Sequence, residues 1–201
     1  MGEWKTAHLG EACQIKYGKD HKHLADGKIP VYGSGGVMRH VNTALYEKKS
    51  VLIPRKGSLE NLFFVETPFW SVDTLFYTEI DEEKVTPEFL FYQLKTFDLA
   101  GMNVGTAVPS LTTAVLNEIE VVIPPLKEQI EIGRTLRALD DKIANNTAIN
   151  HHLSGSMPET DSSPDIRQGK RVSRNKASLR LSTRLFISCS YSEAISPPIA
   201  A

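Results

Sequence analysis

The sequence predicts an α+β protein, in which a mixed, strand-rich N-terminal part precedes a long C-terminal α-helix able to pair in a coiled coil. Two observations lead to this prediction. Up to about residue 123, short apolar segments rich in Val, Ile, Phe and Tyr are bounded by Gly, Pro or charged residues, which is typical of strands. After Pro124 and Pro125, the segment 126–153 contains no proline and a single glycine, and its apolar residues recur at heptad spacing.

Five segments of the N-terminal part are expected to be strands: IPVYGSGGV (29–37), SVLIP (50–54), NLFFV (61–65), TLFYTEI (74–80) and EIEVVI (118–123). The segment PFW (68–70) and the residues around 75–77 are expected in the core. A helix is expected at 86–101, because Thr86 is a suitable N-cap, Pro87 suits the first helical position and Gly101 suits the end.

The arm at 124–153 carries seven residues at alternating spacings of four and three: Ile132, Leu136, Leu139, Ile143, Asn146, Asn150 and Leu153. A helix docked on its own domain would show a similar stripe. Asparagines are poor core residues but set the register between paired helices. We therefore favour a helix that pairs with another helix, and we take these seven residues as its interface.

The last part of the chain, residues 154–201, changes abruptly in composition, since eleven of its 48 residues are serine and no steady period is present. One interpretation is a basic, disordered tail that binds nucleic acid. The other is a non-native end that builds no core. We favour the second, and we expect three parts: a globular domain at 1–123, the helical arm at 124–153 and this tail.

The net charge of -1 conceals an uneven distribution. Residues 1–60 hold ten Lys and Arg against six Asp and Glu, whereas residues 61–100 hold two against eight. One basic and one acidic surface would therefore coexist, and a local field can attract a polyanion at neutral total charge. No apolar run approaches the ~18 residues of a membrane span. The absence of a secretory signal and the two distant cysteines favour a cytoplasmic location.

Several kinds of chemistry lack their sequence patterns. GSGG at 33–36 is not followed by the Lys-Ser/Thr of a phosphate-binding loop. His21 and His23 have no second Cys or His cluster nearby, so we expect no metal site. The run 81–84, DEEK, contains a Glu-x-Lys pair of the kind found in nucleases, but we interpret it as a turn before the helix at 86. A stand-alone nuclease or methyltransferase remains the alternative function, and a helix-mediated scaffold without DNA binding is another.

Cationic residues recur in glycine-containing loops at the ends of the expected strands. Arg and Lys donate to phosphates, and the Arg fork can read guanine. Glycine and serine let backbone N–H groups approach an anion. A single loop of this kind is usually solvated, and Arg55 could instead form a salt bridge with the acidic middle segment. Because three such loops occur within sixty residues, we expect a nucleic-acid-binding surface at Lys16, Lys19, Lys22, Ser34, Gly35, Arg39, Arg55, Lys56, Gly57, Ser58 and Thr106.

Over residues 4–153, the order of motifs resembles one repeat of the specificity (S) subunit of type I restriction–modification systems. The motifs are IPVYGSGG, VLIPRKGS, PFWSVDT, FLFYQL, GTAVPSL and IPPLKEQIEIGRTLRALDDKI. IPPLKEQ leading into a long helix is the most specific of them. The tail after Leu153 does not resemble the family.

The resemblance implies a non-catalytic subunit with a target-recognition domain that reads part of a double-stranded DNA target. Its helix would act as a spacer and bind the modification (methyltransferase) subunits, and a restriction subunit would join the full complex. No cofactor would bind this chain; S-adenosylmethionine, ATP and Mg would belong to the partner subunits. Family members carry two recognition domains and this chain shows one, so we expect self-association through the helix, or else a truncated product.

Overall fold

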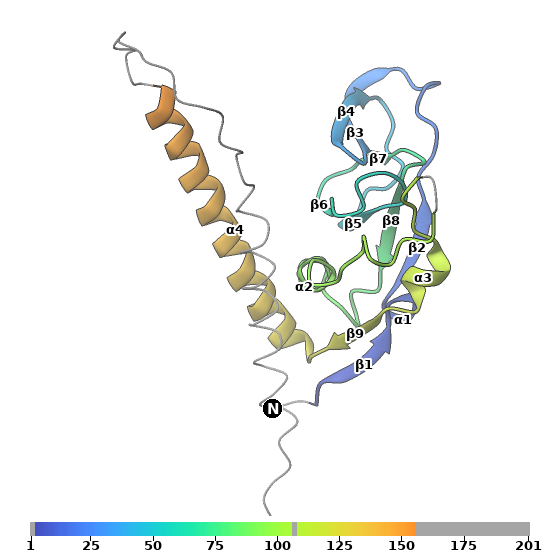
Figure 1. Ribbon diagram of the computed structural model, residues 1–201, viewed down its shortest axis with the longest axis vertical. Coiled ribbons are helices and arrows are strands. Elements are labelled where there is room, and N and C mark those ends of the chain that lie inside the picture. Colours follow the sequence, from blue (N-terminus) through green and yellow to red (C-terminus); the bar gives the residue numbers. More distant parts are fainter. Residues whose placement is uncertain (1–2, 106–107, 156–201) are drawn as a thin grey trace, which may run out of the picture.

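The chain folds into a strand-rich body from which one long helix extends (Figure 1). The computed structural model describes residues 3–105 and 108–155, without the side chains of 153–155. Thr106, the Leu153 side chain and nearly all of the expected tail at 154–201 lie outside this part. The elements, in order, are β1 (Lys5–His8), α1 (Leu9–Ala12), β2 (Cys13–Tyr17), β3 (Asp26–Gly33), β4 (Gly36–Val41), β5 (Ser50–Pro54), β6 (Phe63–Val65), β7 (Trp70–Ser71), β8 (Leu75–Ile80), α2 (Pro87–Leu94), α3 (Thr113–Asn117), β9 (Glu120–Ile123) and α4 (Leu126–Gly155).

The strands form three small sheets. The largest has the order β2-β8-β5-β6, with antiparallel neighbours throughout. The second has the order β4-β3-β7, in which β3 is antiparallel to β4 and parallel to β7. In the third, β1 pairs with β9, which brings the start of the chain next to the start of α4. The predicted mixed α+β class with a long C-terminal helix is confirmed.

The main core lies between the four-stranded sheet and α2. Every residue of β5 is buried, and Phe76 of β8 and Phe89 of α2 belong to the same apolar cluster as Val51 and Ile53. Phe69 and Trp70 are buried as predicted, whereas Pro68 is exposed. A strand with both faces covered needs an unbroken apolar run, and VLIP supplies one.

The predicted helix at 86–101 is shorter than expected, because α2 ends at Leu94. The hydroxyl of Thr96 donates to the carbonyl oxygen of Gln93 at 2.7 Å, and the backbone N–H of Phe97 donates to Leu94 O. These tighter bonds end the α-helical pattern before Gly101. The Thr86 side chain makes no capping hydrogen bond, although Pro87 does occupy the first turn.

Helix α4 docks on the body with its first half and then extends away from it (Figure 1). Ile132 packs against the core cluster and Leu136 is buried. A Cβ at Gly133 would lie 3.2 Å from the Cβ of Glu88, so this glycine sits where α4 approaches α2 closely. Leu139 and Ile143 are 47% and 46% exposed. The stripe of seven residues therefore divides: its first two members contact the body, and the next two are exposed.

A buried glutamine, Gln129, lies near the start of α4. Gln129 is fully buried, and its amide nitrogen donates to the carbonyl oxygens of Lys84 and Pro124 at 2.9 and 2.7 Å. Its amide oxygen accepts the backbone N–H of Thr86 at 2.7 Å. One side chain thus satisfies three backbone groups from the turn before α2 and the start of α4. These contacts cross residue 123, and the domain division there stays a prediction.

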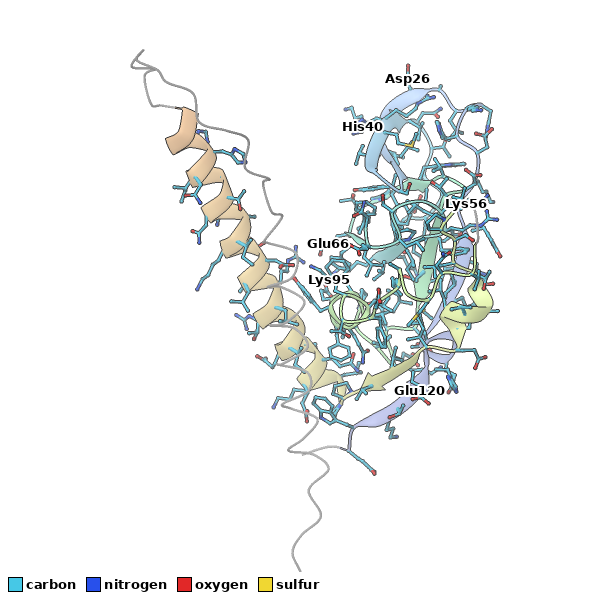
Figure 2. All side chains as sticks on the ribbon, viewed as in Figure 1. Asp26, His40, Lys56, Glu66, Lys95 and Glu120 are labelled. Atoms are coloured by element: carbon cyan, nitrogen blue, oxygen red, sulfur yellow. The ribbon has the colours of Figure 1, made fainter. Side chains whose placement is uncertain are left out.

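Several charged side chains lie between the body and α4. Figure 2 shows two of them, Glu66 and Lys95, facing the helix. The guanidinium of Arg137 donates two hydrogen bonds to the carboxylate of Glu66, at 2.9 and 2.6 Å. Lys49 contacts both Glu66 and Glu88. Further along α4, Asp140 accepts the hydroxyl of Tyr92 at 3.1 Å and lies 3.4 Å from the Lys95 ammonium.

The ion pair between Glu66 and Arg137 predicts a pH dependence. The Arg137 hydrogen bonds hold the pKa of the Glu66 carboxyl below its ordinary value of 4.5. A depressed pKa in the folded state stabilises the fold above the unfolded pKa, and this contribution is lost as the pH falls through the folded value. In urea denaturation, we expect Glu66→Gln to lower stability at neutral pH by less than about 1 kcal/mol, because the pair is largely exposed. The difference should vanish in acid; an equal difference at both pH values would contradict the assignment.

Candidate nucleic-acid interface

Strand directions bring five loops, three of them the predicted cationic loops, to one edge of the body. Tyr17 at the end of β2 pairs with Phe76, and Pro54 at the end of β5 pairs with Leu75. The ends of β2 and β5 therefore lie beside the start of β8. Strands β3 and β7 are parallel, so their ends coincide as well. We call the loops that meet there the loop cluster: residues 18–22, 33–36, 55–58, 72–74 and the described residues of 103–110.

Main-chain hydrogen bonds join these loops. The backbone N–H of Lys19 donates to Ser71 O at 2.8 Å, and that of Arg55 donates to Thr74 O at 2.9 Å. The N–H of Gly57 donates to Pro109 O at 3.1 Å. The side-chain amide of Asn61 donates to Ser34 O at 3.1 Å, which ties the β3–β4 turn to the loop after β5.

Two glycines are required by this arrangement. Gly57 has a φ of 87°, which side-chain-bearing residues rarely adopt, so the turn after β5 forms as predicted. A Cβ at Gly18 would lie 2.0 Å from the carbonyl oxygen of Val72. Gly18 therefore allows the loop after β2 to contact the loop after β7.

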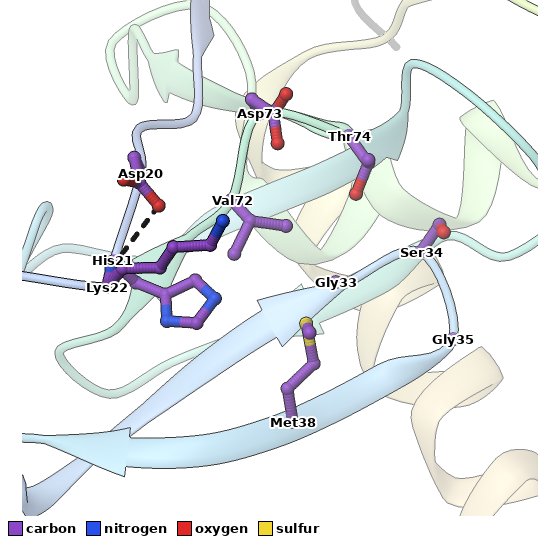
Figure 3. Close-up of a pocket in the computed structure, with 10 residues that line it drawn as sticks. All are labelled: Asp20, His21, Lys22, Gly33, Ser34, Gly35, Met38, Val72, Asp73 and Thr74. Atoms are coloured by element: carbon purple, nitrogen blue, oxygen red, sulfur yellow. Dashed lines mark hydrogen bonds between the residues drawn. The ribbon is translucent and has the colours of Figure 1, made fainter.

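A cavity of about 640 Å³ opens between the loops (Figure 3). Its walls come from the 20–22 segment, the β3–β4 turn with Met38, and the 72–74 segment. Lys22, Ser34 and Gly35, three of the predicted DNA contacts, line it. Aspartates at positions 20 and 73 line it too, so the cavity is not uniformly basic.

Most of the predicted DNA-binding residues lie in the loop cluster, and two do not. Lys16 belongs to β2 and precedes the loop that follows this strand. Its ammonium lies 3.8 Å from the carboxylate of Glu79. Arg39 donates to Leu24 O and to Asp26 at 2.9 Å, near the hairpin end farthest from the turn. Their role in DNA binding stays a prediction. The residues that the cluster brings together are Lys19, Lys22, Ser34, Gly35, Arg55, Lys56, Gly57 and Ser58.

Arg55 makes two contacts that sequence reasoning did not anticipate. Its Nη1 donates to the backbone carbonyl of Asp73 at 3.2 Å, and its guanidinium carbon lies 5.2 Å from the centre of the Tyr17 ring. The salt bridge considered as an alternative does not appear among its contacts with the described residues; the acceptor is a main-chain oxygen. The Arg55 guanidinium thus lies over the exposed ring of Tyr17 and orients the 72–74 loop through its hydrogen bond. In Figure 2, Lys56 lies on the side of the body that faces away from α4.

Sequence reasoning also missed Asp20, Asp73, Met38 and Tyr17. Nothing in their local patterns separates them from solvated loop residues. Their common location depends on the parallel pairing of β3 with β7, between segments distant in the chain.

Cys13 and the acidic side chains bear on whether the described residues hold a nucleophile or a metal site. Burial raises the pKa of the Cys13 thiol to about 12, so this cysteine is protonated near neutral pH and is a poor nucleophile. Across 3–105 and 108–155 no cluster of three or more His, Cys, Asp or Glu side chains could hold a metal ion. The DEEK run forms a turn, as predicted, in which Lys84 pairs with Asp81 at 3.0 Å. None of the helices in the same residues is long and apolar enough to cross a bilayer.

Comparisons with known proteins point in one direction. The chain is 32% identical over 117 residues to a protein of Haemophilus influenzae described as a type I restriction enzyme specificity subunit, covering 56% of this chain and 30% of that protein. It is 28% identical over 153 residues to a type I specificity subunit of Mycoplasma pneumoniae, covering 71% of this chain and 50% of that one. The chain thus spans half or less of these relatives.

The fold agrees with this likeness. The crystal structure of the S subunit of a type I restriction–modification system from M. genitalium aligns with a TM-score of 0.64 at 20% identity, covering 75% of this chain and 43% of that one. The family described as the type I restriction modification DNA specificity domain matches residues 1–154. This match covers the strand-rich body and nearly all of α4, and the chain therefore belongs to that family.

Proposed function

We propose that this chain recognises part of a double-stranded DNA target within a type I restriction–modification assembly. The observation that carries the proposal is the loop cluster, which gathers four cations (Lys19, Lys22, Arg55 and Lys56) and small residues on one edge of a body that belongs to this family. Cations from separate loops can follow a phosphate backbone, while side chains between them reach the base edges. Methylation and cleavage, with S-adenosylmethionine, ATP and Mg, would be carried out by other subunits.

The second part of the proposal concerns α4. The chain spans half or less of the curated relatives described above. We propose that two copies pair through the exposed half of α4, where Leu139 and Ile143 present apolar side chains and Asn146 follows on the same stripe. The arm would also provide the surface for the modification subunits. Paired helices of this kind would place one loop cluster at each side of the complex.

The proposed function is tested by measuring affinity for duplex DNA at increasing salt with the full chain, alone and mixed with its modification subunit. Phosphate contacts release counterions, so the logarithm of the affinity should fall linearly with the logarithm of the salt concentration. A target can be selected from random duplexes in the same experiment. Affinity independent of salt, or no enrichment of any sequence, would overturn the proposal.

Arg55 is the residue whose replacement should weaken binding most clearly. Arg55→Ala removes a cation from the loop cluster and the hydrogen bond to Asp73 O, and we expect affinity at matched salt to fall about tenfold, roughly 1.4 kcal/mol. The fold should persist, because the side chain lies outside the core. Arg55→Lys keeps the charge but not the planar fork and should fall between the two.

Lys5→Ala is the matched control for Arg55→Ala, since Lys5 is an exposed cation on β1, outside the loop cluster. Its affinity should equal that of the unchanged protein. Equal losses for Lys5→Ala and Arg55→Ala would mean that only total charge matters, and would exclude a specific contribution from Arg55.

A further inference from the structure

The cavity at the loop cluster has one apolar wall. Met38 is 60% exposed, and its sulfur lies over Gly33, where a Cβ would be 2.6 Å away. The side chain of Val72 closes the same wall, 3.7 Å from that position. An exposed methionine is ordinary when it is isolated.

This methionine is not isolated. Among the described residues of the body before α4, the large apolar side chains that are strongly exposed are Tyr17, Val37, Met38, Val104 and Val108. All of them lie in the loop cluster or beside it, at the end of β2, the β3–β4 turn and the 103–110 loop. Apolar side chains that gather at one place on a surface indicate a contact site.

The opposite wall carries two aspartates together with Lys22. Figure 3 shows Asp20 and Asp73 across the cavity from Met38. Asp20 accepts the backbone N–H of Lys22 at 3.2 Å, which leaves its second oxygen uncommitted. The carboxylate of Asp73 makes no hydrogen bond or ion pair with the described residues, although Arg55 holds its main chain. His21 also lines the cavity, and its Nδ1 is buried without a hydrogen-bond partner among the described residues.

Carboxylates are out of place on a surface that only follows phosphates, because the like charges repel. They become favourable where the ligand offers hydrogen-bond donors. In the major groove, the donors are the amino groups N6 of adenine and N4 of cytosine, and the apolar group is the C5-methyl of thymine. An A·T pair presents the amino group and the methyl group together on one edge, whereas a G·C pair presents no methyl group.

We infer that this cavity reads the major-groove edge of an A·T base pair, with Asp73 accepting from adenine N6 and Met38 contacting the thymine methyl. The inference rests on the proposed function and assigns specificity-determining residues to it. The β3–β4 hairpin is a two-stranded ribbon, which the major groove admits. Lys22 in the cavity lining and Arg55 and Lys56 in a neighbouring loop then contact phosphates, and Asp20 assists as a second acceptor.

The test starts from the duplex selected by the full chain and replaces single bases in it. At one A·T position, uracil in place of thymine removes only the methyl group and should weaken binding about fourfold, the effect of one buried methyl. Purine in place of adenine removes only N6 and should weaken binding about tenfold. As a base control, adenine is replaced with 2,6-diaminopurine, which adds an amino group only in the minor groove. This duplex should still be preferred over the purine duplex, because N6 is kept.

Protein variants then assign each effect to its side chain. Met38→Ala should abolish the difference between thymine and uracil while keeping the difference between adenine and purine. Asp73→Ala should abolish the difference between adenine and purine while keeping the difference between thymine and uracil. Val108→Ala is the matched control, since Val108 is also exposed in the loop cluster but does not line the cavity, and it should preserve both differences.

The outcomes separate the two proposals. Absence of any salt-dependent binding would overturn the proposed function itself. Salt-dependent, selective binding without a required A·T position would overturn only the inference about the cavity. So would a thymine–uracil difference that persists in Met38→Ala, or an adenine–purine difference that persists in Asp73→Ala.

Discussion

Replacing the buried Gln129 with leucine should lower the free energy of unfolding by about 3 kcal/mol, the largest loss of stability expected from any of the replacements proposed. The variant keeps the approximate size of the side chain but removes the three hydrogen bonds to Thr86 N, Lys84 O and Pro124 O. Each buried backbone group left without a partner costs about 1–3 kcal/mol, and water can reach some of them. Urea denaturation monitored by tryptophan fluorescence measures the loss.

Gln14→Leu is the matched control for Gln129→Leu, because Gln14 is an exposed glutamine on β2. It should change stability by no more than about 0.5 kcal/mol. Hydrogen exchange gives a second measurement: the Thr86 amide should lose protection in Gln129→Leu, since its acceptor has gone. A stability loss for Gln129→Leu no larger than that for the control would show that the three hydrogen bonds contribute nothing net.

The second large effect concerns the proposed pairing of α4. Leu139→Asp combined with Ile143→Asp should abolish self-association, because each aspartate would bring a charge into an apolar interface, and two copies would bring four. The fold of the body should persist, since both side chains are about half exposed in the single chain. Burying two such apolar residues contributes roughly 1.5–3 kcal/mol each, so the dissociation constant should rise by more than about a hundredfold.

Sedimentation or light scattering across a range of concentrations measures the oligomeric state, with and without the modification subunit. Ala138→Asp with Ala144→Asp serves as the control, because these exposed alanines lie on other faces of α4 and cost the helix a similar propensity. The control should still associate. An unchanged protein that stays monomeric and takes up no modification subunit would overturn the proposed role of the arm.

Elements with a strong local signal were predictable from the sequence. β5 carries the apolar run VLIP and is buried throughout, β8 begins with the apolar residues LFY, and the proline-free α4 follows two prolines. β2 and β7 were not predicted. CQIKY does alternate apolar and polar side chains, but over only five residues, and WS is too short to show a period. The end of α2 was expected at Gly101. The helix ends earlier, because the hydroxyl of Thr96 donates to the carbonyl oxygen of Gln93, and this hydrogen bond was not considered.

The candidate site was predictable only in part, for a related reason. Loops that follow strands can be recognised from glycine and charge, and Arg55 to Ser58 were recognised in this way. Which loops meet depends on the order of strands in the sheets. The pairing of β3 with β7 brings the β3–β4 turn to the 72–74 loop, and no local pattern encodes it. Lys16 and Arg39 were included because of their charge, and their partners Glu79 and Asp26 could not be foreseen.

The hydrogen bonds that join the loops have a consequence for how such a protein can diverge. Lys19, Arg55 and Gly57 are held through main-chain atoms, and only one hydrogen bond of this frame, from the Arg55 side chain to Asp73 O, depends on the side chain at position 19 or 55. A new side chain can therefore appear at an exposed loop position while the strands underneath keep their packing. Preference for a different ligand sequence could then evolve by a few replacements at the rim, at little cost to folding.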